Sequence, residues 1–478
     1  MHAVDFSALE YRKDATFQEA SYRYEGDTDT GWRILREGKE HLILPAGYRL
    51  LKSIRCGVCS TDLARHHLPF PLPQITGHEV IAEDESGKTV AAEINASHRS
   101  TGSPLAASCS FCRQGLPTHC PDRLTLGIDR LPGGFAPWIL VPEMNVVEIP
   151  GNVYGRASVL IEPFAAALHA TEQIGLTGLE RVAVLGAGRL GLLIVAALTG
   201  RRETKGGSFS IEAIDQERER LQIAKSLGAD RVWEDAGAVM IAPDNAPPFD
   251  MVFESTGSPQ GLALALAASS REVHLKSTTG MASLGLEHVT AMVVDEVSLG
   301  PLGREGNDPI PPPPASQGIA MIIGGHISDE QARTVERAGY ETIWIRNDDD
   351  LRKGFDSVRG GDSEQVPLAV VESIESIDKI LRPWPDREQG IIRPRGTILL
   401  ADVDQPRAGL LAPILKRGIK ISTSRCGDFR LALPIMQKLL EKGIDPGTII
   451  TDELPVNELP EAFARARSPG SIKVVLVH

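Results

Sequence analysis

The feature that most constrains the fold of this chain is a glycine-rich segment near its middle, Val182-Ala-Val-Leu-Gly-Ala-Gly-Arg-Leu-Gly191. A short apolar run ends at the first glycine, and a long apolar run begins beside the last. In a strand, turn and helix of this kind, Gly186 permits a tight turn and Gly188 lets backbone N–H groups approach a pyrophosphate, while Gly191 lets the helix pack closely on the strand. The segment therefore predicts a βαβ fold that binds a dinucleotide.

An acidic residue follows the next apolar run. Asp215 comes directly after residues 211–214, and a carboxylate at the end of this second strand accepts hydrogen bonds from both ribose hydroxyls and repels a 2′-phosphate. NAD is therefore favoured over NADP, although the basic residues of 201–208 keep NADP open, and the alternative is that Asp215 is a solvated strand-end residue. The candidate cofactor contacts are Gly186, Gly188, Arg189, Leu190, Gly191, Asp215, Arg220 and Thr256.

Two kinds of hydrophobic pattern divide the chain. From about residue 165 to 300, strand-like runs alternate with helical ones, which predicts βαβ units and a parallel sheet. From about residue 30 to 150, short apolar runs are broken by Gly, Pro and Asp, as is typical of a β-rich domain. We therefore predict an α/β protein in which a β-rich domain accompanies a parallel, Rossmann-type sheet.

Internal similarity appears beyond the glycine motif. The runs 211–233, 250–255 and 271–275 are echoed in the same order by 319–344, 368–373 and 395–399. Between these copies lies Asp308-Pro-Ile-Pro-Pro-Pro-Pro314, whose fixed φ angles suit a semi-rigid spacer. We predict an internal duplication, and the alternative is that any two βαβ segments look alike. The second copy has no glycine motif, so we expect it to bind no dinucleotide.

Composition restricts the partners and the compartment. Hydrophobic residues make up 42% and charged residues 24% of the 478 residues, which indicates an ordinary globular protein. The formal charge of −13 argues against nucleic-acid and anionic-membrane partners, because both require a basic face. A small-molecule substrate is the expected partner. The N-terminal residues show no signal-peptide pattern, and no apolar stretch reaches the length of a membrane span, so we expect a cytoplasmic protein.

Potential zinc ligands occur in three separate loops. The segments are Gly57-Val-Cys-Ser-Thr-Asp62, Gly77-His-Glu79 and Ile161-Glu-Pro163. One thiolate, one imidazole and one carboxylate with an open fourth position let zinc lower the pKa of an alcohol and polarise the carbonyl that forms. Zinc has no redox chemistry, so the hydride must pass to a separate acceptor, which the glycine motif would hold. Taken one at a time, each of these residues has an ordinary structural alternative.

With these motifs, the sequence resembles the zinc-containing medium-chain dehydrogenase/reductases, especially the threonine and sorbitol dehydrogenase-like branch. The resemblance covers nearly all of the chain except roughly 301–395 and implies a GroES-like catalytic domain with a Rossmann domain. It implies that Cys59, His78 and Glu162 hold the catalytic zinc, with Glu79 adjacent and able to exchange with water or a ligand. It also implies that Thr61 bonds the substrate hydroxyl and begins the proton relay.

The sequence departs from the family pattern at the relay. The family commonly has a histidine five residues after the zinc cysteine, where this chain has Ala64. His66 or His67 could take its role, and the alternative is that both are surface histidines.

A second departure concerns the structural-zinc lobe, where Cys109, Cys112 and Cys120 match the last three of the family's four cysteines and Ala106 stands at the first position. His98 or His119 could complete a tetrahedron, or the lobe could be metal-free.

The predicted domains are a GroES-like catalytic domain over 1–160, completed by 450–478, and a Rossmann NAD-binding domain over 161–302. A Pro-rich linker over 303–317 and a partial Rossmann-like repeat over 318–449 follow.

Because the family pairs its subunits through the last strand of the cofactor sheet, the repeat could make the chain a monomer that mimics a dimer, or could decorate an ordinary homodimer. The leading function is a zinc-dependent dehydrogenase of a secondary alcohol, polyol or hydroxy-amino acid. The alternative is a catalytically degenerate relative that serves as a regulatory or assembly module.

Overall fold

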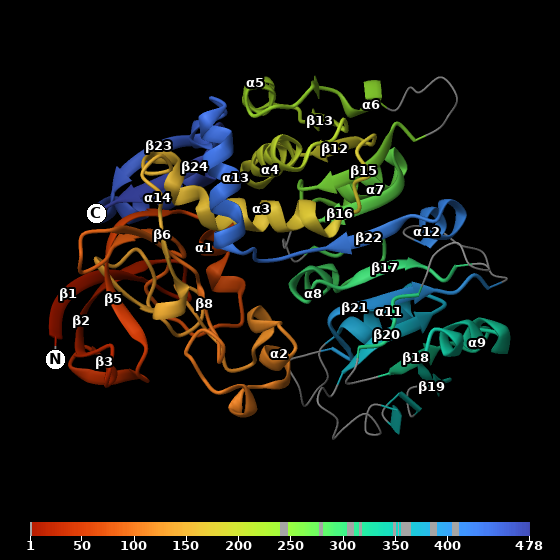
Figure 1. The fold of residues 1–478 in the computed structure, drawn as a ribbon, viewed down its shortest axis with the longest axis horizontal. Coiled ribbons are helices and arrows are strands. Elements are labelled where there is room, and N and C mark those ends of the chain that lie inside the picture. The colour runs from red at the N-terminus through yellow and green to blue at the C-terminus, as the bar shows by residue number, and fades with distance from the viewer. Residues whose placement is uncertain are drawn as a thin grey trace. The chain divides into compact units, whose positions relative to one another are not determined.

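A computed structural model describes residues 2–239, 247–276, 281–303, 310–314, 318–347, 350–351, 353–354, 365–382, 390–403 and 411–478. The chain divides into two compact units, of which the first comprises 1–166 with 426–478 and the second comprises 167–425. Both units are drawn in Figure 1. In the described part of the chain, none of the helices combines the length and the apolar character that crossing a bilayer would require.

The first unit is rich in β-structure. A seven-stranded sheet has the order β11-β7-β6-β5-β24-β23, with β10 also paired to β5, and a separate antiparallel sheet joins β1 to β4. The strands are β1 (His2–Tyr11), β2 (Phe17–Asp27), β3 (Gly31–Arg36), β4 (Lys39–Leu44), β5 (Tyr48–Gly57), β6 (Glu79–Glu83), β7 (Thr89–Ala92), β8 (Asn95–Ala96), β9 (Leu124–Thr125), β10 (Trp138–Pro142), β11 (Val146–Glu148), β23 (Ile450–Pro455) and β24 (Lys473–Val477). Its helices include α1 (Ser60–Leu63), α2 (Ser110–Arg113), α13 (Phe429–Glu441) and α14 (Leu459–Arg467). Helix α3 (Ile161–Gln173) runs through residue 166, where the unit ends.

The C-terminal strand completes this sheet. Strand β24 pairs antiparallel with β5, placing Leu476 opposite Cys56. Strand β5 contributes Leu50, Leu51 and Cys56 to a hydrophobic core that also contains Val80 and Leu476. The end of the chain therefore shares one core with the segment that carries the predicted zinc ligands.

The second unit contains an 11-stranded sheet. Its order is β14-β13-β12-β15-β16-β22-β17-β21-β20-β18-β19. The strands are β12 (Arg181–Leu185), β13 (Ser210–Ile214), β14 (Arg231–Trp233), β15 (Phe249–Glu254), β16 (Ser269–Leu275), β17 (Ser298–Pro301), β18 (Ile319–Ile323), β19 (Glu341–Ile345), β20 (Val366–Val371), β21 (Ile392–Leu400) and β22 (Lys420–Thr423). The helices between them include α4 (Arg189–Lys205), α5 (Arg218–Ser226), α6 (Ala236–Val239), α7 (Pro259–Ala268), α8 (Val289–Val294), α9 (Asp329–Arg337), α11 (Ile374–Leu381) and α12 (Leu411–Arg417).

Neighbouring strands of this sheet run parallel except for one pair, β17 and β22, which is antiparallel. These two strands are also exchanged between the halves of the sheet. Strand β17 follows β16 in the chain but pairs in parallel with β21, whereas β22 follows β21 in the chain but pairs in parallel with β16. Each half of the sheet is therefore completed by a strand that follows the other half in the chain: β22 completes the half that contains β16, and β17 completes the half that contains β21.

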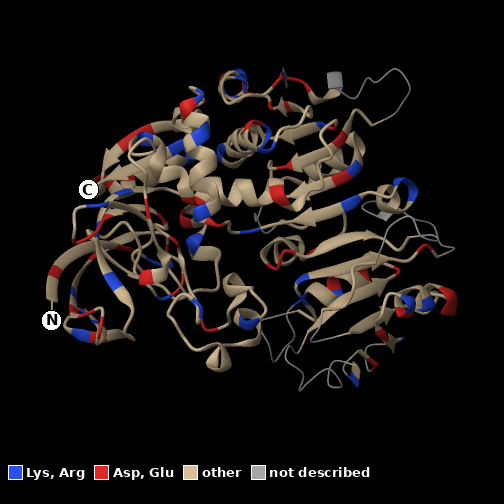
Figure 2. Cartoon of the chain, viewed as in Figure 1, with Lys and Arg blue, Asp and Glu red and all other residues tan. Residues whose placement is uncertain are grey.

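The predicted α/β fold class, with a GroES-like β-rich unit and a large Rossmann-type parallel sheet, is confirmed by this architecture. Strands β18 to β21, which carry the second set of similar segments, belong to the same sheet as β12 to β16. The internal duplication and the predicted domain limits stay predictions. Residues 304–309 and 315–317 of the predicted Pro-rich linker lie outside the described residues. In Figure 2, acidic and basic residues are scattered over both units rather than gathered in one.

Candidate functional site

The glycine motif forms the turn between β12 and α4. Gly186 has a φ of +93°, which favours glycine, and a Cβ there would lie 3.0 Å from the backbone nitrogen of Thr256. A Cβ at Gly191 would overlap the carbonyl oxygen of Gly186, so these two glycines bring strand and helix together. A Cβ at Gly188, by contrast, would meet no atom within 4 Å. The turn is thus tightly packed on one side and open at Gly188, where a phosphate could approach the helix N-terminus.

Asp215 stands beside this turn at the end of β13. Its carboxylate accepts a hydrogen bond of 2.7 Å from the backbone N–H of Ala187 and another of 2.9 Å from that of Glu217. Arg220 lies 4.0 Å from the same carboxylate. Arg189 and Leu190 are half-buried on the first turn of α4. Strand β13, the second strand of the βαβ motif, therefore places the Asp215 carboxylate at the glycine turn, within reach of a nucleotide bound there.

The next strand end, that of β15, carries Thr256. Its backbone N–H donates to Oε1 of the buried Glu254 at 2.8 Å, and its hydroxyl bonds to the same oxygen. Burial raises the pKa of the Glu254 carboxyl, whereas the bonds from Thr256 oppose that rise. The polar loop after β15 is thereby held against the glycine turn.

In the first unit, three of the predicted metal-site residues come together. One ligand atom each from Cys59, His78 and Glu79 lies within 4.8 Å of the others. Cys59 precedes α1, and the other two residues stand where β6 begins. His78 and Glu79 are 3% and 1% exposed, whereas Cys59 is half-buried, so two of the three side chains that converge here are removed from water. Glu162, on the first turn of α3, is not a member of this group, and its role as a zinc ligand stays a prediction.

Asp62 organises this group, a role that was not predicted from the sequence. Its Oδ2 accepts from the backbone N–H of Cys59 at 2.8 Å, and its Oδ1 lies 3.5 Å from Nδ1 of His78. Burial opposes protonation, but the Asp62 carboxylate and the Cys59 thiolate raise the pKa of His78 well above its ordinary value. With Nδ1 facing the carboxylate, Nε2 remains for a metal. The spacing of Asp62, three residues after a helix N-cap, is the local signal that could have revealed it.

Glu79 is paired with a lysine from the far end of the chain. Nζ of Lys473 forms an ion pair with Oε2 of Glu79 and donates to the carbonyl oxygen of Val58 at 3.0 Å. Both side chains are 2% exposed. A Cβ at Gly57 would overlap Oε2 of Glu79 and approach Cε of Lys473 to 2.9 Å, so the pair occupies space that a glycine leaves open. A lysine within the apolar run Lys473-Val-Val-Leu-Val477 was the sequence signal for a buried ion pair.

The surroundings of the group bear on proton transfer. The hydroxyl of Thr61 lies 3.7 Å from Sγ of Cys59. Ala64, in the place of the family's relay histidine, follows α1. His66 accepts or donates a 3.0 Å hydrogen bond with the hydroxyl of Tyr11, and its ring lies 3.7 Å from that of His67, centroid to centroid. The substitute relay residue stays a prediction.

A second set of potential ligands lies in the lobe of the first unit. His98, Cys109, Cys112 and Cys120 each place one ligand atom within 4.8 Å of the others. Nδ1 of His98 lies 3.4 Å from Sγ of Cys120. Its other nitrogen, Nε2, lies 3.5 Å from a carboxylate oxygen of Asp122. A carboxylate behind the outer nitrogen is the usual support of a metal-bound histidine.

The lobe differs from the family pattern in a defined way. Ala106, which stands at the first cysteine position, is exposed and is not a member of the cluster. His98 occupies the fourth corner from a different loop. Three thiolates and one imidazole suit a closed tetrahedral zinc site, whereas Cys59, His78 and a carboxylate suit an open catalytic one. The donor chemistry of both groups therefore fits zinc.

Comparison with known proteins places both groups in one matched segment. A family model described as the alcohol dehydrogenase GroES-like domain matches residues 45–151. L-threonine 3-dehydrogenase of Rhizobium johnstonii is 27% identical to this chain over 336 residues, which span 67% of this chain and 90% of that protein. L-threonine 3-dehydrogenase of Chelativorans sp. is 32% identical over 195 residues, which span 38% of this chain and 54% of that protein.

Solved structures share the fold. A short chain alcohol dehydrogenase of Escherichia coli CFT073, determined in complex with NADH, aligns with a TM-score of 0.58 and 18% identity over 99% of both chains. The 2R,3R-butanediol dehydrogenase of Bacillus subtilis aligns with a TM-score of 0.52 and 16% identity, over 99% of this chain and 100% of that one.

Proposed function

Because the chain belongs to the zinc-containing medium-chain dehydrogenase/reductases, we propose that it oxidises a secondary alcohol, polyol or hydroxy-amino acid with NAD as the hydride acceptor. The observation that carries this proposal is the convergence of Cys59, His78 and Glu79 within 4.8 Å in a buried setting. The names of its relatives, threonine and butanediol dehydrogenases, favour a substrate with a secondary hydroxyl.

Each residue of the catalytic group has a distinct part in this proposal. Cys59 and His78 hold zinc, and Asp62 orients His78 through its outer nitrogen. Glu162 completes the ligand set, and Glu79, which forms an ion pair with Lys473, stands beside the zinc position and exchanges with water or a ligand there. When bound there, zinc supplies Lewis-acid stabilisation of the negative charge that develops on the substrate oxygen. Thr61, whose hydroxyl lies beside Cys59, hydrogen-bonds the substrate hydroxyl and hands its own proton to water as it takes the substrate's.

The glycine turn supplies the nucleotide site of this proposal. Gly186, Gly188 and the first turn of α4 bind the pyrophosphate, and Asp215 bonds the adenosine ribose, which favours NAD over NADP. A nicotinamide cofactor held by these residues would supply the acceptor for the substrate's hydride. His98, Cys109, Cys112 and Cys120 hold a second, structural zinc.

Metal analysis of the purified chain, combined with a screen of NAD reduction over secondary alcohols and sugars, tests the proposal. We expect two zinc ions per chain and reduction of NAD by at least one substrate. Cys59→Ser should lose one zinc and nearly all activity, whereas His98→Ala should lose the other zinc. Full activity of Cys59→Ser would refute the catalytic assignment, and an unchanged zinc content of His98→Ala would refute the structural one.

A further inference from the structure

A completely buried arginine stands six residues after Cys59 in the first unit. Arg65 directly follows the short turn of helix that begins at Ser60, and it is 0% exposed. Burial lowers the pKa of its guanidinium, and the carboxylates of Asp129 and Asp62 oppose that change. A guanidinium nevertheless keeps its charge in proteins, and removing a charge from water is costly. The surroundings of Arg65 must therefore supply bonds that offset this cost.

The hydrogen bonds of Arg65 join two stretches of the chain. Its Nη2 lies 2.8 Å from the carbonyl oxygen of Pro71, 3.0 Å from Oε1 of Gln74 and 2.7 Å from the carbonyl oxygen of Ile128. Its Nη1 donates to the carbonyl oxygen of Phe70 at 3.3 Å. All of these acceptors are neutral oxygens, so the guanidinium serves here as a planar fork of donors rather than as half of an ion pair.

Gln74 extends the connection that Arg65 makes. While its Oε1 accepts from Arg65, its Nε2 donates to the carbonyl oxygen of Leu131 at 3.0 Å. The Gln74 side chain is also buried, at 4% exposed. Arg65 and Gln74 thus attach residues 65–74 to residues 128–131 through buried bonds that water does not compete for.

The loop that receives these bonds lies against the peptide before His78. A Cβ at Gly127 would overlap the carbonyl oxygen of Gly77, so residues 127–134 pass directly over this peptide. On the other side, the N–H of Gly77 donates to Oδ1 of Asp62 at 3.1 Å. The backbone that carries His78 is therefore held between Asp62 and the loop of residues 127–134.

Two routes consequently link the segment of Cys59 to the segment of His78, which precede α1 and β6 in Figure 1. The first route is Asp62, which accepts from the backbone N–H groups of Cys59 and Gly77. The second begins at Arg65, on the far side of α1, and reaches the loop over Gly77. Asp62 acts close to the ligands, whereas Arg65 holds the two segments from outside.

We propose that Arg65 is a positioning residue of the catalytic metal site, which sets the spacing of Cys59 and His78 by joining the turn beside the thiolate to the loop behind the imidazole. The inference rests on the proposed zinc site. The hydrogen-bond partners of Arg65 are protein oxygens, so it acts through the backbone and not by contact with the metal. Lysine cannot replace it, because a single ammonium lacks the planar fork that reaches both stretches at once.

Cobalt substitution of the full chain tests this geometry directly. Co²⁺ replaces zinc, and its d–d and thiolate-to-metal absorption bands report how the metal is coordinated. The spectrum of the Cys59→Ser protein, whose cobalt remains in the lobe, is subtracted to isolate the catalytic site. For Arg65→Lys and Arg65→Met, we expect this difference spectrum to change and the Kd for catalytic zinc, measured by competition with a chelator, to rise about tenfold. The zinc of the lobe should be retained.

Gln74→Met gives a milder test, which also serves if the Arg65 variants do not fold. It removes one acceptor of Arg65 and the bond to Leu131, so it should change the spectrum and the zinc Kd in the same direction but less. Ile34→Ala is the matched control, because Ile34 is buried in β3 of the separate antiparallel sheet. Its truncation destabilises the core of the unit but should leave both measurements unchanged.

An unchanged spectrum and zinc affinity in the variants of Arg65 and Gln74 would overturn the role of Arg65 while leaving the zinc site standing. The same changes in Ile34→Ala would also overturn it, because they would then reflect lost stability alone. If Cys59→Ser left the cobalt spectrum of the protein unchanged, the proposed zinc site would fail and this inference with it.

Discussion

At the scale of single residues, the pair of Lys473 and Glu79 shows how a buried charge depends on its partner. Both side chains are 2% exposed, and they come from the two separate sequence segments that make up the first unit. Removing one member of such a pair leaves an uncompensated charge in a low dielectric, which costs far more than the pair itself contributes. We therefore expect Lys473→Met to lower the free energy of unfolding by about 3 to 5 kcal/mol, measured by urea denaturation at pH 7.

The control for this effect is Lys438→Met, since Lys438 is 41% exposed on α13. It should change stability by less than about 0.5 kcal/mol. In the double variant Glu79→Gln with Lys473→Met, most of the loss should be recovered, because the stranded carboxylate is gone. A Lys473→Met protein as stable as the unsubstituted one would show that Glu79 does not need this counter-charge.

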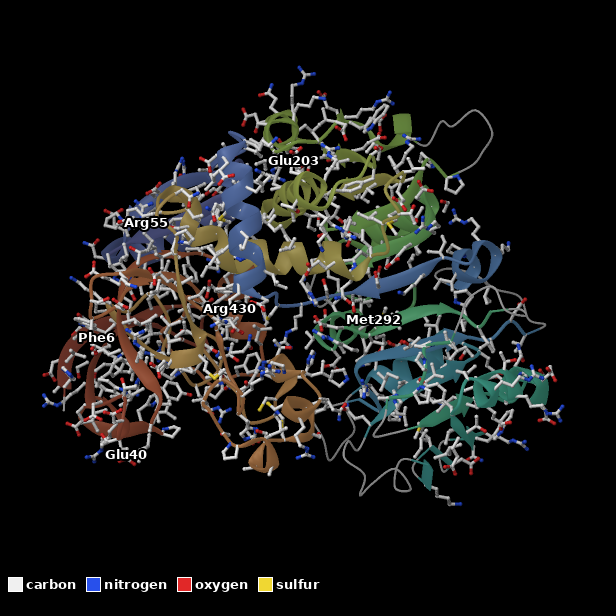
Figure 3. The ribbon with its side chains drawn as sticks, viewed as in Figure 1. Phe6, Glu40, Arg55, Glu203, Met292 and Arg430 are labelled. Atoms are coloured by element: carbon white, nitrogen blue, oxygen red, sulfur yellow. The ribbon has the colours of Figure 1, made fainter. Side chains whose placement is uncertain are left out.

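Glu93 gives a residue-scale prediction for pH. Burial and the nearby Asp428 carboxylate raise the pKa of Glu93 to about 7, while Arg430, labelled in Figure 3, opposes the rise. A carboxyl whose pKa is higher in the folded than in the unfolded state stabilises the fold below its unfolded pKa, and that contribution is lost as pH rises through 7. Glu93→Gln should therefore be more stable than the unsubstituted protein at pH 8, by about 2 to 4 kcal/mol.

The gain from Glu93→Gln should shrink toward zero as pH falls below 5, because Glu93 is then neutral in both states. Thermal or urea unfolding at pH 4.5, 6 and 8 measures this trend. Glu85→Gln serves as the control, since Glu85 is exposed in the turn before β7. A gain that is the same at all three pH values would contradict the raised pKa.

Residue-level interpretation of the sequence reached furthest where the chemistry was local. The glycines of 186–191 and the pair His78-Glu79 stand close together in sequence, so their roles could be predicted, and those roles stay predictions. Contacts between distant segments were harder to predict. The Lys473 partner of Glu79 depends on strand pairing, which single-sequence patterns do not encode. The sequence offered both His98 and His119 as a fourth ligand of the lobe, and only the packing of the loops selects His98.

At the scale of elements, the exchange of β17 and β22 sets the topology of the large sheet. Leu299 and Ile421 are the antiparallel partners at this junction, and both are buried. Leu299 lies on β17, which follows β16 in the chain but pairs with β21, and Ile421 lies on β22, which follows β21 but pairs with β16. Each side chain therefore supports one of the two exchanged strands. We expect Leu299→Ala and Ile421→Ala each to lower the free energy of unfolding by about 2 to 5 kcal/mol, measured by urea denaturation.

Because Leu299 and Ile421 are direct partners, their combined substitution should cost less than the sum of the two single changes. Leu431→Ala is the control, since this α13 side chain is 54% exposed, and it should cost less than about 0.5 kcal/mol. Strictly additive losses would show that the two strands do not support each other at this point.

Periodicity predicted the kinds of elements better than their partners. The alternation of apolar runs correctly indicated a β-rich segment before 150 and βαβ units after 165. It could not indicate that β17 leaves the strands before it to pair with β21, because both destinations offer an equally apolar neighbour. The register of an exchanged strand depends on long-range packing, which a pattern of period two cannot specify.

At the scale of the whole molecule, the large sheet bears on the number of chains in the particle. On one side of the antiparallel junction lie six strands that begin with β22, and on the other lie five that begin with β17. The hydrophobic cluster that supports them includes Leu185 and Val273 from one side and Ile323 and Val371 from the other. The strand edge through which a parallel sheet could extend to a second subunit is thus already paired within the chain.

We therefore expect the protein to be a monomer in which the five strands β17, β21, β20, β18 and β19 take the place of a partner subunit. Light scattering coupled to size exclusion should give a mass near 51.5 kDa at micromolar concentration. The mass should stay the same over a hundredfold dilution, because pairing within one chain does not depend on concentration. A mass near twice that value would contradict the monomer. Two chains would then be joined through an outer strand, β14 or β19, or through another surface of the molecule.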